Sequence, residues 1–258
     1  MGWQTRRGKL ASVEIFLTAD AQAPCVGADG KATLRPNVMS KPPLSGPSSA
    51  ETESLPAFIA RQEDALNRAR KAERGAQLIE SAKDAAEAIR ARVPGPSQDL
   101  SYEERAALIA VKRMLFNAAA DIWPGWSVDE NRSSREELDD ALDLARQSAD
   151  LVEVLNLGKC QEGTAAWLVG AFELALGQIQ DSLTSFSRAE RLYADAAEPA
   201  LVLLTRGYSA IACEAGGAMP GCTPNLSEIL EQLSAGNFED GKDFCEQLRT
   251  AHAIFTGR

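Results

Sequence analysis

From Trp167 to Ala215, apolar side chains recur every three or four residues, which is the spacing of a helix that packs along one face. Gly177 interrupts this pattern once and Pro199 interrupts it again. Because glycine and proline commonly mark the ends and starts of helices, we expect three helices, with a turn at Gly177 and a break near Pro199. No stretch of similar length alternates apolar and polar residues as a β-strand would. The pattern predicts an all-α protein.

The same spacing runs through the preceding part of the chain. Residues 56–92 carry mostly small apolar side chains at helical steps, and Gly75 is expected to divide them into two antiparallel helices. A single long helix or a dimeric coiled-coil arm is the alternative. Ser101 is a candidate N-cap for the next helix, which Trp123-Pro124-Gly125-Trp126 must stop.

Further helices are expected on either side of the central stretch. Ser133 or Ser134 is a candidate N-cap for a helix that ends at Gly158. After the helix that begins at Pro199, two helices are expected near residues 227–233 and 239–255, joined at Gly236-Asn237.

The chain divides into two regions by composition. Residues 41–50, KPPLSGPSSA, form a Pro, Ser and Gly tract that cannot bury enough apolar surface to offset its ordering entropy. Residues 1–54 are therefore predicted to be a disordered segment and residues 55–258 a helical domain.

Met39 directly precedes the tract, so one hypothesis makes Met39 the natural start of the protein. An authentic disordered tail is the alternative. Mass spectrometry of the native protein would distinguish the two.

The central hairpin resembles a tetratricopeptide repeat. That family has a small residue midway along its first helix, a glycine at the turn, and small and aromatic residues along its second helix. Gly170, Gly177, Phe186 and Ala189 occupy these positions here. This sequence departs from the family's pattern at Ser182, where alanine is usual. Its closing proline also comes late, at Pro199. Trp167 and Phe172 each lie one place from its aromatic positions.

Two weaker echoes of the repeat flank the central one. One begins at Gly236, with Gly241, Cys245 and Leu248 at the corresponding steps, and the other uses Ala141, Ala145 and Ser148. The resemblance implies antiparallel helical hairpins stacked as a short tetratricopeptide-like solenoid. It also implies a concave face that binds a peptide, a partner protein or the rest of a multi-protein complex.

Charge and cysteine content narrow the classes of partner and compartment. The net charge of −10 disfavours nucleic acid and anionic membrane surfaces, which are bound by clustered Lys and Arg. We find neither a secretory signal nor an apolar run that could span a membrane, so a cytoplasmic location is expected. Five scattered cysteines are typical of free thiols in a reducing compartment. A single Cys213–Cys222 bridge is the alternative.

The sequence offers no group of residues typical of catalysis. His252 is the only histidine, and the carboxylates are expected on solvated helix faces, so we predict no catalytic residues, no metal and no cofactor. The protein is therefore predicted not to be an enzyme. An enzyme that uses a reactive cysteine, Cys160 or Cys222, is the least favoured alternative.

Five aromatic residues form the candidate interaction surface: Trp123, Trp126, Trp167, Phe172 and Tyr208. The first two flank a Pro-Gly turn, where they would either form an aromatic platform for a ligand or pack the corner onto the next hairpin. We expect an interaction or scaffold module with a protein or peptide partner, in an oligomeric state that the sequence leaves open. The alternative is a sensor that binds a small molecule or peptide in a pocket lined by Trp167, Phe172 and Tyr208.

Overall fold

The computed structural model describes residues 53–72, 75–93, 100–126, 133–217 and 225–257, and within these ranges it contains helices and no strand. The helices are α2 Leu55–Lys71, α3 Gly75–Arg90, α4 Tyr102–Ile122, the 3-10 helix η2 Pro124–Trp126, α5 Arg135–Val154, α6 Lys159–Ala175, α7 Ile179–Asp195, α8 Pro199–Ala215, α9 Leu226–Ala235 and α10 Gly241–Thr256. The all-α prediction is confirmed, as is the division of residues 56–92 into two helices. Predictions for residues 1–52 lie outside the described residues.

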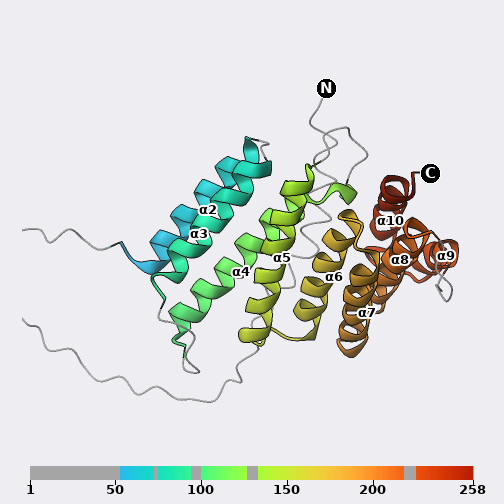
Figure 1. Cartoon of the computed structure of the whole chain (residues 1–258). Helices are drawn as coiled ribbons and strands as arrows, with labels where there is room; N and C mark the ends of the chain where they lie inside the picture. Colours follow the sequence, from blue (N-terminus) through green and yellow to red (C-terminus); the bar gives the residue numbers. More distant parts are fainter. Residues whose placement is uncertain (1–52, 73–74, 94–99, 127–132, 218–224, 258) are drawn as a thin grey trace, which may run out of the picture.

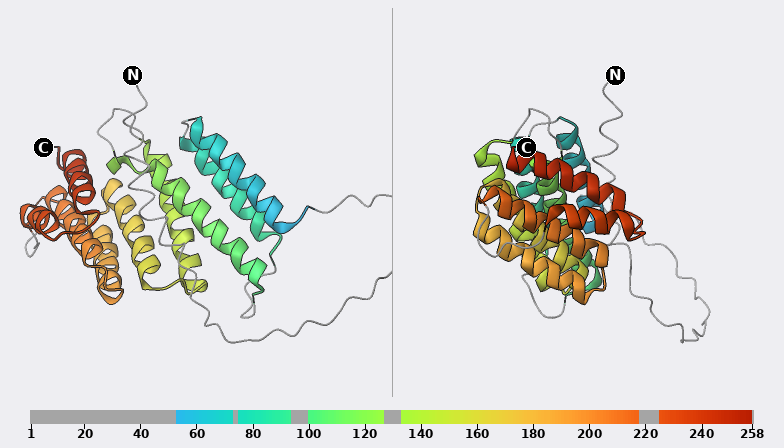
Figure 2. Two further views of the ribbon diagram at one scale, coloured as in Figure 1. Left: turned by 180° about the vertical axis from the view of Figure 1, so that it is seen from behind. Right: turned by 90° about the vertical axis from the view of Figure 1, so that its right-hand side faces the viewer.

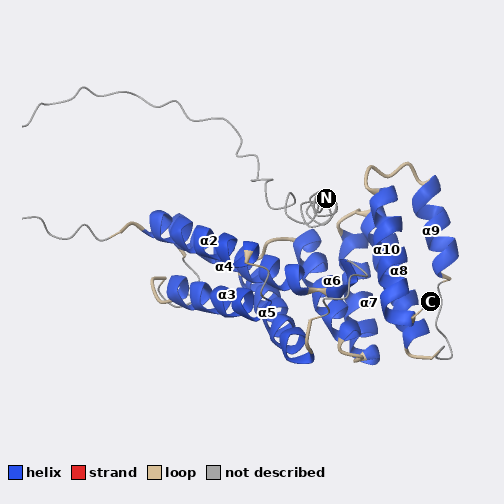
Figure 3. Cartoon of the chain, turned by 90° about the horizontal axis from the view of Figure 1, so that it is seen from above, coloured by secondary structure: helices blue, strands red, loops and turns tan. Residues whose placement is uncertain are grey.

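The helices pack in chain order, so that each lies against the one before it and the one after it (Figure 1). Short connections join α5, α6, α7 and α8, which makes neighbouring helices antiparallel. The last helix departs from this order: α10 packs on α8 and α9 and also reaches η2, far back in the chain. Figures 2 and 3 show the row of helices from behind, from its end and from above.

Serine caps fix the starts of two helices. Ser101 before α4 and Ser134 before α5 each accept a hydrogen bond from the backbone N–H of a glutamate three residues on, Glu104 and Glu137. Each glutamate accepts one in return from the serine's backbone N–H, which completes a capping box. The prediction of a cap at Ser101 is confirmed, and of the two candidates before α5 it is Ser134 that caps.

Three successive helices end in the same way. After α5, α6 and α7, a residue with positive φ reverses the chain: Asn156 at 49°, Gly177 at 77° and Ala197 at 57°. The next backbone N–H then donates to a carbonyl five residues back: Leu157 to Val152, Gln178 to Glu173 and Glu198 to Tyr193. The turn at Gly177 is confirmed. The prediction that Gly158 ends α5 is wrong, because Asn156 takes the left-handed conformation and Gly158 is instead the N-cap residue of α6.

The hairpins have a regular length. The helices α6, α7 and α8 begin at residues 159, 179 and 199, so successive helices start 20 residues apart and a hairpin occupies 40 residues. A tetratricopeptide hairpin takes roughly 34 residues. The membership of this stack in a tetratricopeptide-like solenoid therefore stays a prediction.

Small residues set the distances between paired helices. A Cβ added to Gly163 or Gly170 on α6 would lie 2.9 Å from the ring of Tyr193 or Phe186 on α7. On α8, a Cβ added to Gly207 would lie 2.5 Å from the Leu248 side chain of α10. Because each glycine faces a large buried side chain, these helices approach closely. A single apolar core continues from α2 to α10.

Candidate functional site

The five aromatic residues expected to form an interaction surface lie mainly in the core. Trp123, Trp167, Phe172 and Tyr208 are each at most 2% exposed, and only Trp126 is half-buried. The prediction of an accessible aromatic surface is therefore wrong for four of the five. The Trp123 to Trp126 corner was expected either to form an aromatic platform for a ligand or to pack onto the next hairpin. Its contacts agree with packing.

Trp123 lies at the centre of this aromatic cluster, which comprises Trp123, Trp126, Trp167, Tyr208 and Phe255. Its ring centroid lies 4.9 Å from Trp126, 5.7 Å from Trp167, 5.6 Å from Tyr208 and 6.1 Å from Phe255. Most of these pairs meet edge to face, the arrangement that aromatic quadrupoles favour. The cluster therefore ties together α6, α8, α10 and the corner that follows α4.

The polar side-chain atoms of Trp123, Trp126 and Tyr208 have hydrogen-bond partners inside the protein. The Trp123 indole N–H donates to the carbonyl of Ala171 at 3.1 Å, and the Trp126 indole N–H donates to the carbonyl of Ala120. The Tyr208 hydroxyl accepts a hydrogen bond from Gln247 Nε2 at 2.8 Å. Because these groups already have internal partners, they are not available to recognise a ligand.

Burial also suppresses the acid-base chemistry of the two buried tyrosines. It raises the pKa of Tyr208 above the ordinary value, an effect that the hydrogen bond from Gln247 only partly offsets. Burial likewise raises the pKa of Tyr193, whose hydroxyl donates to Thr164 Oγ1 at 3.0 Å. Both phenols therefore stay neutral in the folded protein at physiological pH.

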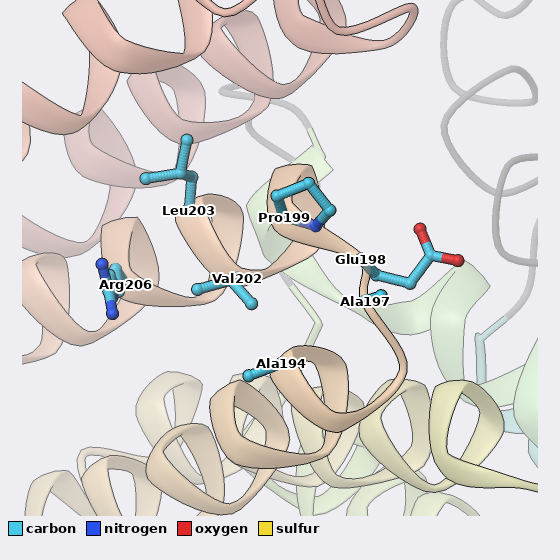
Figure 4. Close-up of a pocket in the computed structure, with 7 residues that line it drawn as sticks. All are labelled: Ala194, Ala197, Glu198, Pro199, Val202, Leu203 and Arg206. Atoms are coloured by element: carbon cyan, nitrogen blue, oxygen red, sulfur yellow. The ribbon is translucent and has the colours of Figure 1, made fainter.

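An apolar groove lies at the surface where the end of α7 meets the start of α8, with a volume of about 370 Å³ (Figure 4). We call this groove the α7–α8 groove. Its lining residues are Ala194, Ala197, Glu198, Pro199, Val202, Leu203 and Arg206. In Figure 4 the Val202 and Ala194 side chains face each other across the gap between the two helices. Val202 and Leu203 are half-buried, while Ala194 and Pro199 are exposed. The groove therefore presents aliphatic surface to a ligand.

Charged side chains border the groove at two places. Arg206 pairs with Glu190 of α7 through Nε and Oε1 at 2.8 Å, which holds the guanidinium beside the aliphatic floor. Glu198 lies in the connection before α8 and points away from Val202 in Figure 4.

Burial raises the pKa of the nearby Cys160 thiol, and the carboxylate of Glu198 raises it further. Cys160 is therefore a poor nucleophile at neutral pH.

Sequence reasoning missed the groove, although one signal was present. Residues 201–204 read Leu-Val-Leu-Leu, and four consecutive apolar residues of a helix cover all of its sides. Leu204 is buried as expected, but Val202 and Leu203 are left at the surface. A run wider than one helical face therefore indicated an apolar surface patch on α8.

The cysteines differ from expectation at one position. Cys213 is disulfide-bonded, whereas Cys160 and Cys245 are free. The expectation of free thiols throughout is therefore wrong at Cys213. The proposed partner, Cys222, lies outside the described residues.

Two features are absent from the described part of the chain. Its His, Cys, Asp and Glu side chains form no group of three or more that could hold a metal ion. None of its helices combines the length and apolar character that crossing a bilayer requires.

Comparison with protein-family models, with curated proteins and with solved structures found no match for this chain.

Proposed function

We propose that the protein is a non-enzymatic interaction or scaffold module that binds a protein or peptide partner in the α7–α8 groove. The observation that supports this most directly is the unfilled aliphatic surface of Val202, Leu203 and Pro199 between two helices. A half-buried apolar groove of this size suits the insertion of one or two apolar side chains from a partner segment. Desolvation of such side chains would supply most of the binding free energy.

No observation favours the sensor alternative. That alternative depended on a pocket lined by Trp167, Phe172 and Tyr208, but these side chains are buried and Trp167 lies directly against Tyr208, with ring centroids 5.3 Å apart. We accordingly place the interaction on the outer surface of α7 and α8. The absence of catalysis stays a prediction, as does the cytoplasmic location.

Site-specific photo-crosslinking in the source cells tests the proposal. A photoreactive side chain at Ala194, inside the groove, is expected to give one discrete adduct. The same side chain at Ser187, an exposed position on α7 outside the groove, is expected to give none. Equal adducts from both positions, or none from Ala194, would contradict the proposal.

A matched pair of substitutions tests the contribution of the apolar floor. Val202→Asp places a charge in the groove, and we expect the Ala194 adduct to fall about tenfold or more, because an apolar side chain of the partner would meet a charged carboxylate in place of an aliphatic surface. Val154→Asp makes the same change on α5 at a position that is 62% exposed and outside the groove, and should leave the adduct unchanged. Thermal melting of both variants checks that the fold is retained.

A further inference from the structure

The α7–α8 groove carries charges of opposite sign at its two ends. In Figure 4, Glu198 lies at one end of the groove, Arg206 lies at the other, and Val202 lies between them. Because Arg206 follows Glu198 by eight positions, their backbones are about 12 Å apart along the axis of α8. A partner segment that lies along the groove would therefore meet a carboxylate, then an aliphatic surface, then a guanidinium.

The guanidinium of Arg206 is held in place but keeps most of its hydrogen-bonding capacity. Its Nε donates to Glu190 Oε1 at 2.8 Å, which restricts the orientation of the group. Among the described residues, no other group accepts a hydrogen bond from it, so both Nη atoms are available to a partner. Two Nη atoms match the two oxygens of a carboxylate. The side chain is 45% exposed, so a partner can reach it.

The charge that faces the groove at this end is the guanidinium and not the carboxylate with which it pairs. Arg206 lines the groove, whereas Glu190 does not. The Glu190 side chain is also the less exposed of the two, at 31%. The pair therefore presents donors to the groove, and an acidic group of a partner is the complementary ligand.

Arg206 is placed to act together with the aliphatic floor of the groove. Val202 and Leu203 precede it by four and three positions, which puts all three residues on one face of α8. Residues at this spacing have their Cβ atoms about 5–6 Å apart. A helical partner segment with an aliphatic residue and a carboxylate one turn apart presents them at the same spacing. Such a segment would contact the floor and the guanidinium at once.

Glu198 gives the opposite end of the groove a negative charge. It is exposed, and no Lys, Arg or His of the described residues forms an ion pair with it. A basic side chain of the partner is therefore favoured at this end.

We propose that the α7–α8 groove selects a helical partner segment whose one face carries a basic, an aliphatic and an acidic residue at successive turns, with the acidic residue paired to Arg206. This inference rests on the proposed function and adds the chemistry of the partner. Val202 and Leu203 supply the apolar contact, while Arg206 and Glu198 determine which segments bind and in which orientation. Exposed charge pairs of this kind contribute more to specificity than to affinity.

Selection from a phage-displayed library of random peptides of about 14 residues, about four helical turns, tests the proposal. The natural chain is the target, and the Val202→Asp variant removes peptides that bind elsewhere. We expect the enriched peptides to carry Asp or Glu one turn from an aliphatic residue, and Lys or Arg one turn away on its other side. Enriched aliphatic peptides without this charge pattern would overturn the proposal and leave the proposed function standing. Enrichment of no peptide that depends on Val202 would contradict both.

Affinities of one enriched peptide test the pairing with Arg206 directly. Arg206→Gln is expected to weaken binding by about three- to tenfold. Replacing the acidic residue of the peptide by its amide should weaken binding to the natural chain equally and have no effect on binding to the Arg206→Gln variant. As the control, Arg135→Gln removes an arginine that is 76% exposed at the start of α5, and should leave the affinity unchanged. Weaker binding to the Arg135→Gln variant, or an amide effect that persists in Arg206→Gln, would contradict the pairing.

Discussion

At the scale of single residues, the packing of α6 on α7 depends on glycines that face aromatic rings. Gly170 of α6 lies against Phe186 of α7. Gly163 of α6 lies against Tyr193, which follows Phe186 by seven residues on α7. The repeat-like pattern named Gly170 and Phe186, the two residues of the first contact, but did not predict that they face each other. It did not mark Gly163, whose partner Tyr193 lies one turn beyond the matched positions.

The substitution Gly170→Ala tests this packing through the sign of its effect. In an unobstructed helix interior, alanine stabilises relative to glycine by up to about 1 kcal/mol. Here the new Cβ would lie 2.9 Å from the Phe186 ring, so we expect the free energy of unfolding to fall by about 1–3 kcal/mol. Urea denaturation measures the change, with Ser187→Ala on the exposed face of α7 as the control. A gain in stability would show that α6 and α7 are less closely packed than described.

The buried tyrosines predict a loss of stability in alkali. The folded-state pKa values of Tyr193 and Tyr208 are raised above the unfolded value of about 10, so folding favours the protonated phenols. Their contribution is complete below about pH 10 and is lost as the pH rises toward the folded-state values. We expect tyrosinate absorbance from these residues to appear together with unfolding, and Tyr208→Phe to move unfolding to higher pH. Ionisation of both tyrosines in a chain with native circular dichroism would contradict this.

At the scale of elements, helix ends show what the sequence could and could not predict. Ser101, Pro199 and Gly177 were identified because each has a strong local preference for its position. Ala197 was missed because alanine has no intrinsic preference for the left-handed conformation. Asn156 was missed because the nearby Gly158 was taken as the end of the helix, although asparagine also tolerates this conformation.

A pair of substitutions at these turns separates backbone strain from packing. Ala197→Gly is expected to raise the free energy of unfolding by about 0.5–1 kcal/mol, because glycine adopts positive φ without the Cβ clash. Gly177→Ala should lower it by about 1 kcal/mol, since an added Cβ meets nothing within 4 Å and the cost lies in the backbone alone. Chemical denaturation measures both. Effects of the same sign would contradict the shared turn geometry.

At the scale of the whole molecule, the aromatic cluster explains why the site expected from the sequence differs from the site observed. Large aromatic residues near a Pro-Gly corner suit either a binding platform or a buried junction, and the outcome depends on what the distant α10 covers. Phe255 of α10 packs on Trp123, and Gln247 bonds Tyr208. Contacts between residues so far apart in the chain are not visible in local periodicity.

The burial of the aromatic cluster leaves the α7–α8 groove as the exposed apolar feature on which the proposed function depends. The two regions therefore have separable expected roles, since the cluster stabilises the fold and the groove is the proposed binding site. Substitutions in the cluster should change melting, whereas Val202→Asp in the groove should change binding.

Melting of Trp123→Ala is the most direct test of this separation. We expect Tm to fall by about 10 °C, because the substitution opens a cavity at the centre of the cluster and removes the hydrogen bond to Ala171. Trp123→Phe, which keeps an aromatic ring, should show a smaller fall and retain the Ala194 crosslink. An unchanged Tm in Trp123→Ala, accompanied by loss of that crosslink, would show that the tryptophan binds the partner and would contradict the account.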